Sequence, residues 1–419
     1  MNIPFKRGNI LLPKNTDMTK WSVVACDQYT SEPEYWNDVE KIVGDAPSTL
    51  KLTLPEIYLE DENVSERIAK INSNMKALLD EDFFNEYKDS MIYLERTQSD
   101  GKIREGLIGV VDLEAYSYEK GAETPIRATE KTVIERIPPR VKIRENAPLE
   151  LPHIMILIDD DKKQIIENLK NKVSEDDMVY DFDLMKNGGH VKGYLLNEET
   201  MDEVDKGLKE LADKEVFAKK YDVNNKEVLL FAMGDGNHSL ATAKACYEKL
   251  KETMSEEEYL NNPARYALVE LVNLHSPALE FEAINRVIFN TNPEKLLKSL
   301  KEYYQINKDG NGQEIEVITN DADEKWYIEN PKSNIAIGSI QIFLDEYLKN
   351  NEGKIDYIHG EETTKNLAKQ SGNVGFIFEA MPKNELFKTV ILDGSLPRKT
   401  FSMGHSYDKR YYLESRKIK

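Results

Sequence analysis

The chain has 419 residues, with 56 Lys and Arg against 76 Asp and Glu, so its formal net charge is −20. With 40% hydrophobic and 32% charged residues, the composition is typical of a soluble globular protein and excludes disorder as the main state. The acidic excess also disfavours binding to nucleic acid or to anionic membranes, because both partners repel negative charge.

Apolar runs are short throughout the chain. The longest, residues 154–158 and 228–233, fall far below the ~18 residues of a membrane-spanning helix, and the N-terminus lacks a secretory apolar segment. The two cysteines, Cys26 and Cys246, are too few for a disulfide framework or a zinc site. We therefore expect a cytoplasmic protein, with a length that suits two or three domains.

Hydrophobic periodicity predicts helices and strands that are mixed along the chain. From the N-terminus, it predicts helices at 32–42 and 65–79, strands at 91–94, 107–113 and 154–158, a helix at 162–172, strands at 178–182 and 191–196 with a turn at 187–189, and a helix at 199–212. It then predicts a strand at 228–233, helices at 239–253 and 293–303, strands at 314–318 and 325–328, a helix at 339–348, and strands at 374–378 and 388–392. Because strands and helices do not alternate strictly, we predict an α+β fold of mixed sheets with flanking helices.

Composition also suggests how the chain is divided. The polar residues 290–293 end an apolar run, so we expect a main α+β domain at 1–290 and a smaller C-terminal α/β module at 291–419. Residues 126–144 carry six basic against two acidic residues, and residues 397–419 carry seven against two. These two basic segments could face one anion, with the tail returning to the site, or each could neutralise an adjacent acidic surface.

The segment that carries the most local chemistry is GDGNHS at residues 234–239, between an apolar strand and an amphipathic helix. A glycine turn that starts a helix presents backbone N–H groups and the positive end of the helix dipole, a combination that binds anions. The candidate phosphate-binding residues are Gly234, Gly236, Asn237 and Ser239. Asp235 would hold Mg²⁺, and His238 would move a proton. The simpler interpretation, in which Asp235 caps the helix and His238 packs in the core, stays open.

Five segments, in the same order along the chain, resemble motifs of the bacterial and archaeal family known as domain of unknown function 1015. GDGNHSLATA resembles D-G-H-H-R-Y-x-x-A, and VVACDQYTSEPE resembles A-P-P-Y-D-V-I-S-P-E. IRATEKT resembles R-P-H-E-x-T, LVNLHSPALEFEAINRVI resembles L-V-N-x-x-D-P-G-L-x-I-x-P-x-H-R, and DGSLPRKTFSMGHS resembles M-P-x-K-S-T-x-F-x-P-K. Carried over position by position, the resemblance adds Asp27, Glu130, Thr132, Arg286, Lys399 and Thr400 to the candidate site.

The sequence departs from this family at the turn itself. Asn237 stands where the motif has its first His, and Ser239 stands where it has Arg. A phosphate contact would therefore come from basic residues elsewhere, for which the candidates are Arg127, Lys131, Arg136, Arg398 and Lys399. Cys26 lies next to Asp27, and we interpret it as a buried strand residue rather than a nucleophile.

The turn also resembles that of the ParB/sulfiredoxin-like superfamily, which includes partition proteins, a sulfinic-acid reductase and free-serine kinases. The resemblance implies a ParB/sulfiredoxin-like core and nucleotide-dependent phosphoryl transfer to a small hydroxylated metabolite, with serine or phosphoserine as the first guess. It implies ATP or ADP and Mg²⁺ as cofactors, with Asp27 or His238 as the base on the substrate hydroxyl. The alternatives are a non-catalytic nucleotide-gated binding protein and a Mg²⁺-dependent phosphatase. The expected partners are a small anionic metabolite or nucleotide, without nucleic acid or membrane, and the sequence is compatible with a homodimer.

Overall fold

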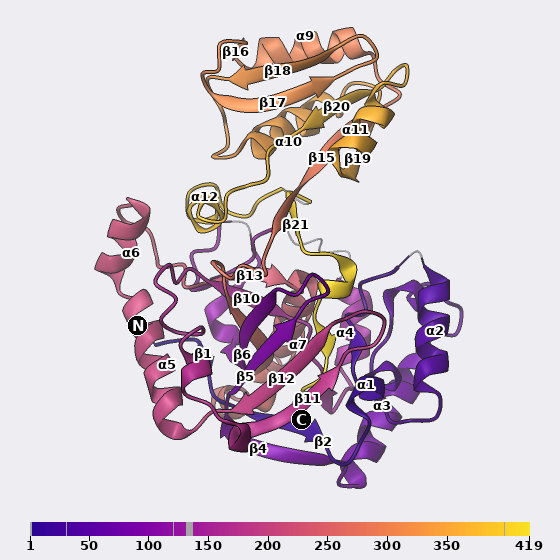
Figure 1. The fold of residues 1–419 in the computed structure, drawn as a ribbon, viewed down its shortest axis with the longest axis vertical. Helices are drawn as coiled ribbons and strands as arrows, with labels where there is room; N and C mark the ends of the chain where they lie inside the picture. Colours follow the sequence, from indigo (N-terminus) through magenta and orange to yellow (C-terminus); the bar gives the residue numbers. More distant parts are fainter. Residues whose placement is uncertain (1, 31, 120, 131–136, 398) are drawn as a thin grey trace. The chain divides into compact units, whose positions relative to one another are not determined.

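The computed structural model describes residues 2–30, 32–119, 121–130, 137–397 and 399–419. The chain forms two compact units (Figure 1). The larger unit comprises residues 1–128, 132–279 and 405–419, and the smaller unit comprises residues 129–131 and 280–404. Mixed sheets with flanking helices confirm the predicted α+β class. Within the described ranges, no helix is both long enough and apolar enough to cross a membrane.

A large mixed sheet forms the centre of the larger unit. Its strands lie in the order β11–β12–β5–β6–β14–β10–β13–β8–β7, and β1 pairs with β6. Their bounds are β1 Phe5–Lys6, β5 Ile92–Thr97, β6 Ile103–Asp112, β7 Tyr116–Ser117, β8 Ile126–Arg127, β10 Met155–Ile158, β11 Met178–Asp183, β12 His190–Leu195, β13 Phe231–Asp235 and β14 Tyr266–Asn273. The central strands β10 and β14 are buried along most of their length, which explains why they read as continuous apolar runs.

Helices and three short strand pairs complete the larger unit. The helices are α1 Met18–Trp21, α2 Pro33–Val43, α3 Val64–Asp80, α4 Ile137–Arg144, α5 Glu198–Leu211, α6 Lys214–Tyr221, α7 Asn237–Lys251 and α8 Glu256–Asn261. The strand pairs are β2 (Gly8–Pro13) with β4 (Phe84–Ser90), β3 (Val23–Val24) with β22 (Tyr411–Tyr412), and β9 (Leu149–Glu150) with β23 (Arg416–Lys417). The last two pairs join the C-terminal segment to earlier parts of the chain.

A buried ionic network fixes that C-terminal segment inside the larger unit. The fully buried carboxylate of Glu270 accepts hydrogen bonds from Arg104 Nε at 3.0 Å and from Arg410 Nη1 at 2.6 Å. Arg410 also donates to Glu414 at 2.6 Å. Burial raises the pKa of Glu270, but the charges of Arg104 and Arg410 outweigh it and lower the pKa below its usual range. The network therefore depends on an ionised Glu270.

The smaller unit has its own antiparallel sheet. Its strands lie in the order β16–β18–β17–β20–β15–β19, and β21 pairs with β15. The strand bounds are β15 Phe281–Phe289, β16 Ile306–Asn307, β17 Gln313–Ile318, β18 Asp323–Ile328, β19 Lys354–His359, β20 Val374–Ile377 and β21 Phe401–Met403. The helices are α9 Pro293–Tyr303, α10 Ala336–Tyr347, α11 Glu361–Ala368 and α12 Glu385–Asp393. The predicted apolar stripe of α10 is buried at Ile340, Phe343 and Leu344.

Two predicted elements are wrong. Residues 388–392 form part of helix α12 rather than a strand, because burial of Leu386, Phe387, Val390 and Ile391 follows a helical spacing that overrides their strand propensity. Residues 162–172 form turns and a short 3₁₀ helix, Leu169–Asn171, rather than an α-helix. There the carboxylate of Asp160 accepts the N–H groups of residues 164 and 165, which offers the backbone an alternative to helical hydrogen bonds.

Candidate functional site

The GDGNHS segment forms a strand, a left-handed turn and a helix start. Strand β13 ends at Asp235, and Gly236 adopts a φ of +76° before α7 begins at Asn237. A Cβ at Gly236 would lie 3.0 Å from the Cα of Ile154, so both the dihedral angle and the close approach favour glycine. The Gly236 N–H donates to Asp235 Oδ1 at 2.8 Å, which holds the carboxylate against the turn.

A lysine from the C-terminal segment faces this carboxylate. Lys409 Nζ lies 3.3 Å from Asp235 Oδ2, and the two side chains are 15% and 20% exposed. The ion pair places a cation beside the N-terminal end of α7, where the helix dipole is also positive. Lys409 thus offsets the negative charge of Asp235, and the helix dipole supplies positive potential for an anion at this turn.

One histidine links Asp27 to the first turn of α7. His153 Nε2 lies 3.1 Å from Ser239 Oγ and 3.9 Å from Asp27 Oδ2. The other ring nitrogen, Nδ1, lies 3.0 Å from the hydroxyl of Tyr412, which accepts the backbone N–H of Cys26 at 3.1 Å. The structure thus brings together Asp27 and Ser239, two predicted site residues that are far apart in the sequence.

The surroundings set different protonation states for the two neighbours Cys26 and Asp27. Burial, together with the charge of Asp27, raises the pKa of the Cys26 thiol to about 12, so the thiol stays protonated near neutral pH. Burial also raises the pKa of Asp27, but attraction to His153, a hydrogen bond from Gln28 and the charge of Lys409 outweigh it. The pKa of Asp27 therefore lies below its usual range, and its half-buried carboxylate is ionised.

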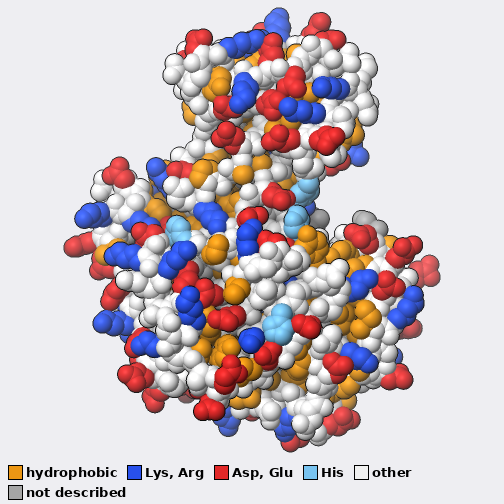
Figure 2. Space-filling model, viewed as in Figure 1, with side chains coloured by type: hydrophobic (Ala, Val, Ile, Leu, Met, Phe, Trp, Pro, Cys, Tyr) orange, Lys and Arg blue, Asp and Glu red, His pale blue; other side chains and the backbone are white. Residues whose placement is uncertain are grey.

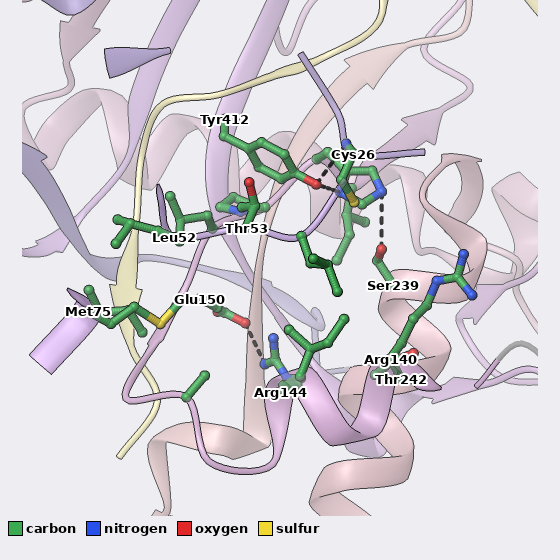
Figure 3. A pocket seen from close by; sticks show the side chains of 18 of the residues that line it. Cys26, Leu52, Thr53, Met75, Arg140, Arg144, Glu150, Ser239, Thr242 and Tyr412 are labelled. Carbon is green, nitrogen blue, oxygen red and sulfur yellow. Dashed lines mark hydrogen bonds and ion pairs between the residues drawn. The ribbon is translucent and has the colours of Figure 1, made fainter. Parts of the chain in front are cut away.

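A cavity of about 140 Å³ lies against this cluster (Figure 3). Its polar end is formed by Cys26, His153, Ser239 and Tyr412. Figure 3 shows Leu52 and Met75 on the side away from Ser239, together with the ion pair between Arg144 and Glu150.

Most of the basic side chains that the structure describes in the two basic segments, 126–144 and 397–419, form ion pairs with carboxylates. The pairs are Arg140–Glu56, Arg144–Glu150, Lys409–Asp235, Arg410–Glu270, Arg416–Glu150 and Lys417–Glu86. Arg127 is buried and donates to the carbonyl oxygens of Thr124 and Glu227 at 2.8 and 2.7 Å. On the face that Figure 2 shows, basic and acidic side chains are interspersed. These contacts favour local charge neutralisation, with Lys409 as the cation placed at the turn.

Other predicted site residues gather in the smaller unit. The guanidinium of fully buried Arg286 donates to Gln341 at 3.0 Å and to the carbonyl of Lys399 at 2.8 Å. Burial raises the pKa of Glu130, although the backbone N–H groups of Lys399 and Thr400 partly offset the rise. The Thr400 hydroxyl donates to the carbonyl of residue 397 at 2.6 Å. The remaining candidates, Lys131, Thr132, Arg136 and Arg398, lie outside the described residues.

Three residues of the cluster were not predicted: His153, Lys409 and Tyr412. His153 begins an apolar strand, so its position suggested a strand edge rather than a ligand-facing side chain. Lys409 and Tyr412 reach the turn through the β3–β22 pair, which joins residues nearly 400 positions apart in the chain. The only sequence signal for them was the basic character of the tail.

A family model supports the resemblance seen in the sequence. The model described as "Protein of unknown function (DUF1015)" matches residues 4–347, which include Asp27 and the GDGNHS turn. The segment with Lys399 and Thr400 lies beyond the matched residues, so its assignment depends on the sequence resemblance alone. No curated protein matches the chain in sequence.

Several solved structures overlap with this one in part. A mutant free serine kinase in complex with ADP matches with a TM-score of 0.40 and 8% identity, over 76% of this chain and 93% of that one. A C-terminally truncated SbnI from Staphylococcus aureus matches with a TM-score of 0.36 and 9% identity, over 71% and 82%. A conserved hypothetical protein from Pyrococcus furiosus matches with a TM-score of 0.36 and 10% identity, over 74% and 94%.

Proposed function

Because the chain belongs to the DUF1015 family, whose description assigns no activity, we propose its function from the site: nucleotide-dependent transfer of a phosphoryl group to the hydroxyl of a small metabolite. The observation that carries the proposal is the convergence of Asp27 and Ser239 on one nitrogen of His153. It places a carboxylate that can accept a proton beside a helix start that can bind a phosphate.

Phosphoryl transfer needs positioning, neutralisation of charge and one base, rather than a covalent nucleophile. The protonated thiol of Cys26 agrees with such a reaction. Asp27 would accept the hydroxyl proton as the new oxygen–phosphorus bond forms and the bond to the nucleotide oxygen breaks. Gly234, Gly236, Asn237 and Ser239 would hold the phosphate, and Lys409 would neutralise part of its charge.

The nucleotide, ATP or ADP, and the first candidate substrates, serine and phosphoserine, follow from the resemblance of the turn. The carboxylate of Asp235 fits Mg²⁺, which binds through one or two carboxylates together with substrate phosphates and water. Across the described residues, no group of three or more His, Cys, Asp or Glu side chains could hold a metal ion. We therefore expect Mg²⁺ to enter with the nucleotide, and bound Mg²⁺ would neutralise phosphate charge. His238, on the first turn of α7, is the second candidate base.

The decisive experiment is a transfer assay. The protein is incubated with Mg²⁺, ATP or ADP and a panel of hydroxylated metabolites, and phosphorylated products are identified by mass spectrometry. The Asp27→Asn variant should lose transfer by about 10²–10⁴-fold while it still binds nucleotide in calorimetry. Asp45→Asn, at an exposed position of the same unit, serves as the matched control.

Two results would contradict the proposal. Nucleotide binding without any product would indicate a nucleotide-gated binding protein. Release of inorganic phosphate from a phosphorylated metabolite without a nucleotide would indicate a phosphatase.

A further inference from the structure

The cavity beside Ser239 has an interior that a small polar metabolite would not fill. Its walls include Leu52, Leu54, Met75, Ile143 and Leu149, most of them buried. Its volume is about 140 Å³. An apolar protein cavity of about 150 Å³ binds benzene, so this one has room for a single six-membered ring or a short branched alkyl group.

The charged groups around the cavity are already paired. Arg140 forms an ion pair with Glu56, and Arg144 lies 2.5 Å from Glu150, which also accepts from Arg416 at 2.8 Å. A zwitterion such as serine would lose its hydration on entering the cavity. The charged side chains of the described walls are already paired with each other, so the charges of serine would be buried without partners, which is costly. Its single methylene would also leave the apolar walls unfilled. An uncharged ligand body suits this lining better.

Three uncharged polar groups gather at one end of the cavity. Ser239 Oγ, Tyr412 Oη and the imidazole of His153 meet there, as Figure 3 shows for Ser239 and Tyr412. These groups can donate and accept hydrogen bonds, so they suit a hydroxyl. His153 Nε2 also lies 3.9 Å from Asp27 Oδ2, so the imidazole connects this end of the cavity to the carboxylate that would take the proton.

We propose that this cavity binds the phosphoryl acceptor, and that the acceptor is an uncharged alcohol whose apolar body has about the size of one six-membered ring. The chemical fate of the hydroxyl rests on the proposed phosphoryl transfer, whereas the binding of the alcohol does not. The substrate class therefore differs from serine and phosphoserine, the first candidates from the sequence.

The test measures binding without nucleotide, so that it does not depend on transfer. Benzyl alcohol, toluene and serine are each titrated into the full chain and followed by ligand-observed NMR. We expect benzyl alcohol to bind more tightly than toluene, because its hydroxyl finds partners, and serine to show no binding at the same concentrations. In the Ser239→Ala variant, the affinity for benzyl alcohol should fall to nearly that for toluene, and the affinity for toluene should stay unchanged.

Variants that fill the cavity locate the site. Ala147→Leu adds volume at a buried wall residue and should weaken benzyl alcohol binding at least tenfold, whereas Ala77→Leu, at an exposed position of α3, should have no effect. Leu59→Phe, at a half-buried wall position, provides a second filling variant should Ala147→Leu not fold. Circular dichroism verifies the fold of each variant.

Three outcomes would overturn the inference: unchanged benzyl alcohol binding in a folded filling variant, competition between adenosine and benzyl alcohol for the cavity, or transfer to serine but to no apolar alcohol. In the last case the proposed function would stand. If the alcohol binds as expected but no nucleotide supports transfer, the proposed function fails and the cavity assignment stands.

Discussion

The hydroxyl of Ser239 lies 3.1 Å from Nε2 of His153, although 86 residues separate them in the sequence. This contact attaches the first turn of α7 to a residue two positions before strand β10. Since the same nitrogen faces Asp27, the helix start and the segment after β3 share one polar cluster. The first two predictions below test whether that cluster performs catalysis, and the last two test what holds it in place.

The pH profile should distinguish the two candidate bases. A base must be unprotonated, and the lowered pKa of Asp27 keeps it ionised down to acidic pH. We therefore expect transfer rates that are flat from about pH 5.5 to 8, and a His238→Gln variant within a few-fold of the parent turnover. A rate that falls tenfold per pH unit below about 6.5 would instead assign the reaction to an imidazole.

Asp235→Asn should abolish the effect of Mg²⁺ on nucleotide affinity. The amide cannot supply the negative charge that a hard cation needs, yet it still accepts the N–H of Gly236. The lost ion pair with Lys409 should cost about 1 kcal/mol of stability or less, because the lysine can reach solvent. Calorimetric nucleotide titrations with and without Mg²⁺ measure the effect, and an unchanged Mg²⁺ dependence would remove Asp235 from the metal site.

Gly236→Ala should destabilise the larger unit more than Gly101→Ala does. The two glycines have similar φ angles of +76° and +82°, but a Cβ would lie 3.0 Å from Ile154 Cα at Gly236 and would meet nothing within 4 Å at Gly101. The shared backbone strain should cost about 1 kcal/mol in each variant, and the close contact should add about 1–3 kcal/mol at Gly236. Urea unfolding gives both free energies, and equal losses would show that the turn can move away from β10.

Glu270→Gln should destabilise the protein by about 3–5 kcal/mol at neutral pH, because it leaves Arg104 buried without its counter-charge and removes one of the two carboxylates that pair with Arg410. The folded-state pKa of Glu270 is lowered, so the stability from its ionisation is present above its unfolded pKa of about 4.3 and is lost as the pH falls through the folded value. The difference between the variant and the parent should therefore shrink below about pH 4. A difference that stays constant with pH would show that Glu270 contributes to stability through its shape rather than its charge.

The local part of the site could be predicted from the sequence. Apolar residues followed by Gly-Asp-Gly and an amphipathic stretch predict a strand, a turn and a helix, and the helix lies at Asn237–Lys251 against the predicted 239–253. Residues 293–303 form a helix with the predicted bounds, because Asn292 caps it and Pro293 starts it. These signals are short-range, so a single sequence contains them.

The contacts that complete the cluster could not be predicted in this way. His153 meets Ser239, and Lys409 meets Asp235, only after distant strands have paired, and pairing depends on packing that no local pattern encodes. Asp27 entered the candidate site through a family motif rather than through its neighbours in the chain. Helix α12 was missed for a related reason. Its β-branched residues favour a strand, and only the burial of one face in the folded protein selects the helical spacing.

The pairing of β22 with β3 gives the cluster an order of assembly during biosynthesis. During translation, Asp27 is synthesised early and the glycine turn follows midway. Lys409 and Tyr412 leave the ribosome only after the whole smaller unit has been translated. Until then, Asp235 lacks its ammonium partner and His153 lacks the hydroxyl that meets its Nδ1. Because domains generally fold as units while the chain is being made, a nascent chain that stops before residue 409 would display the glycine turn without the groups that complete the cluster.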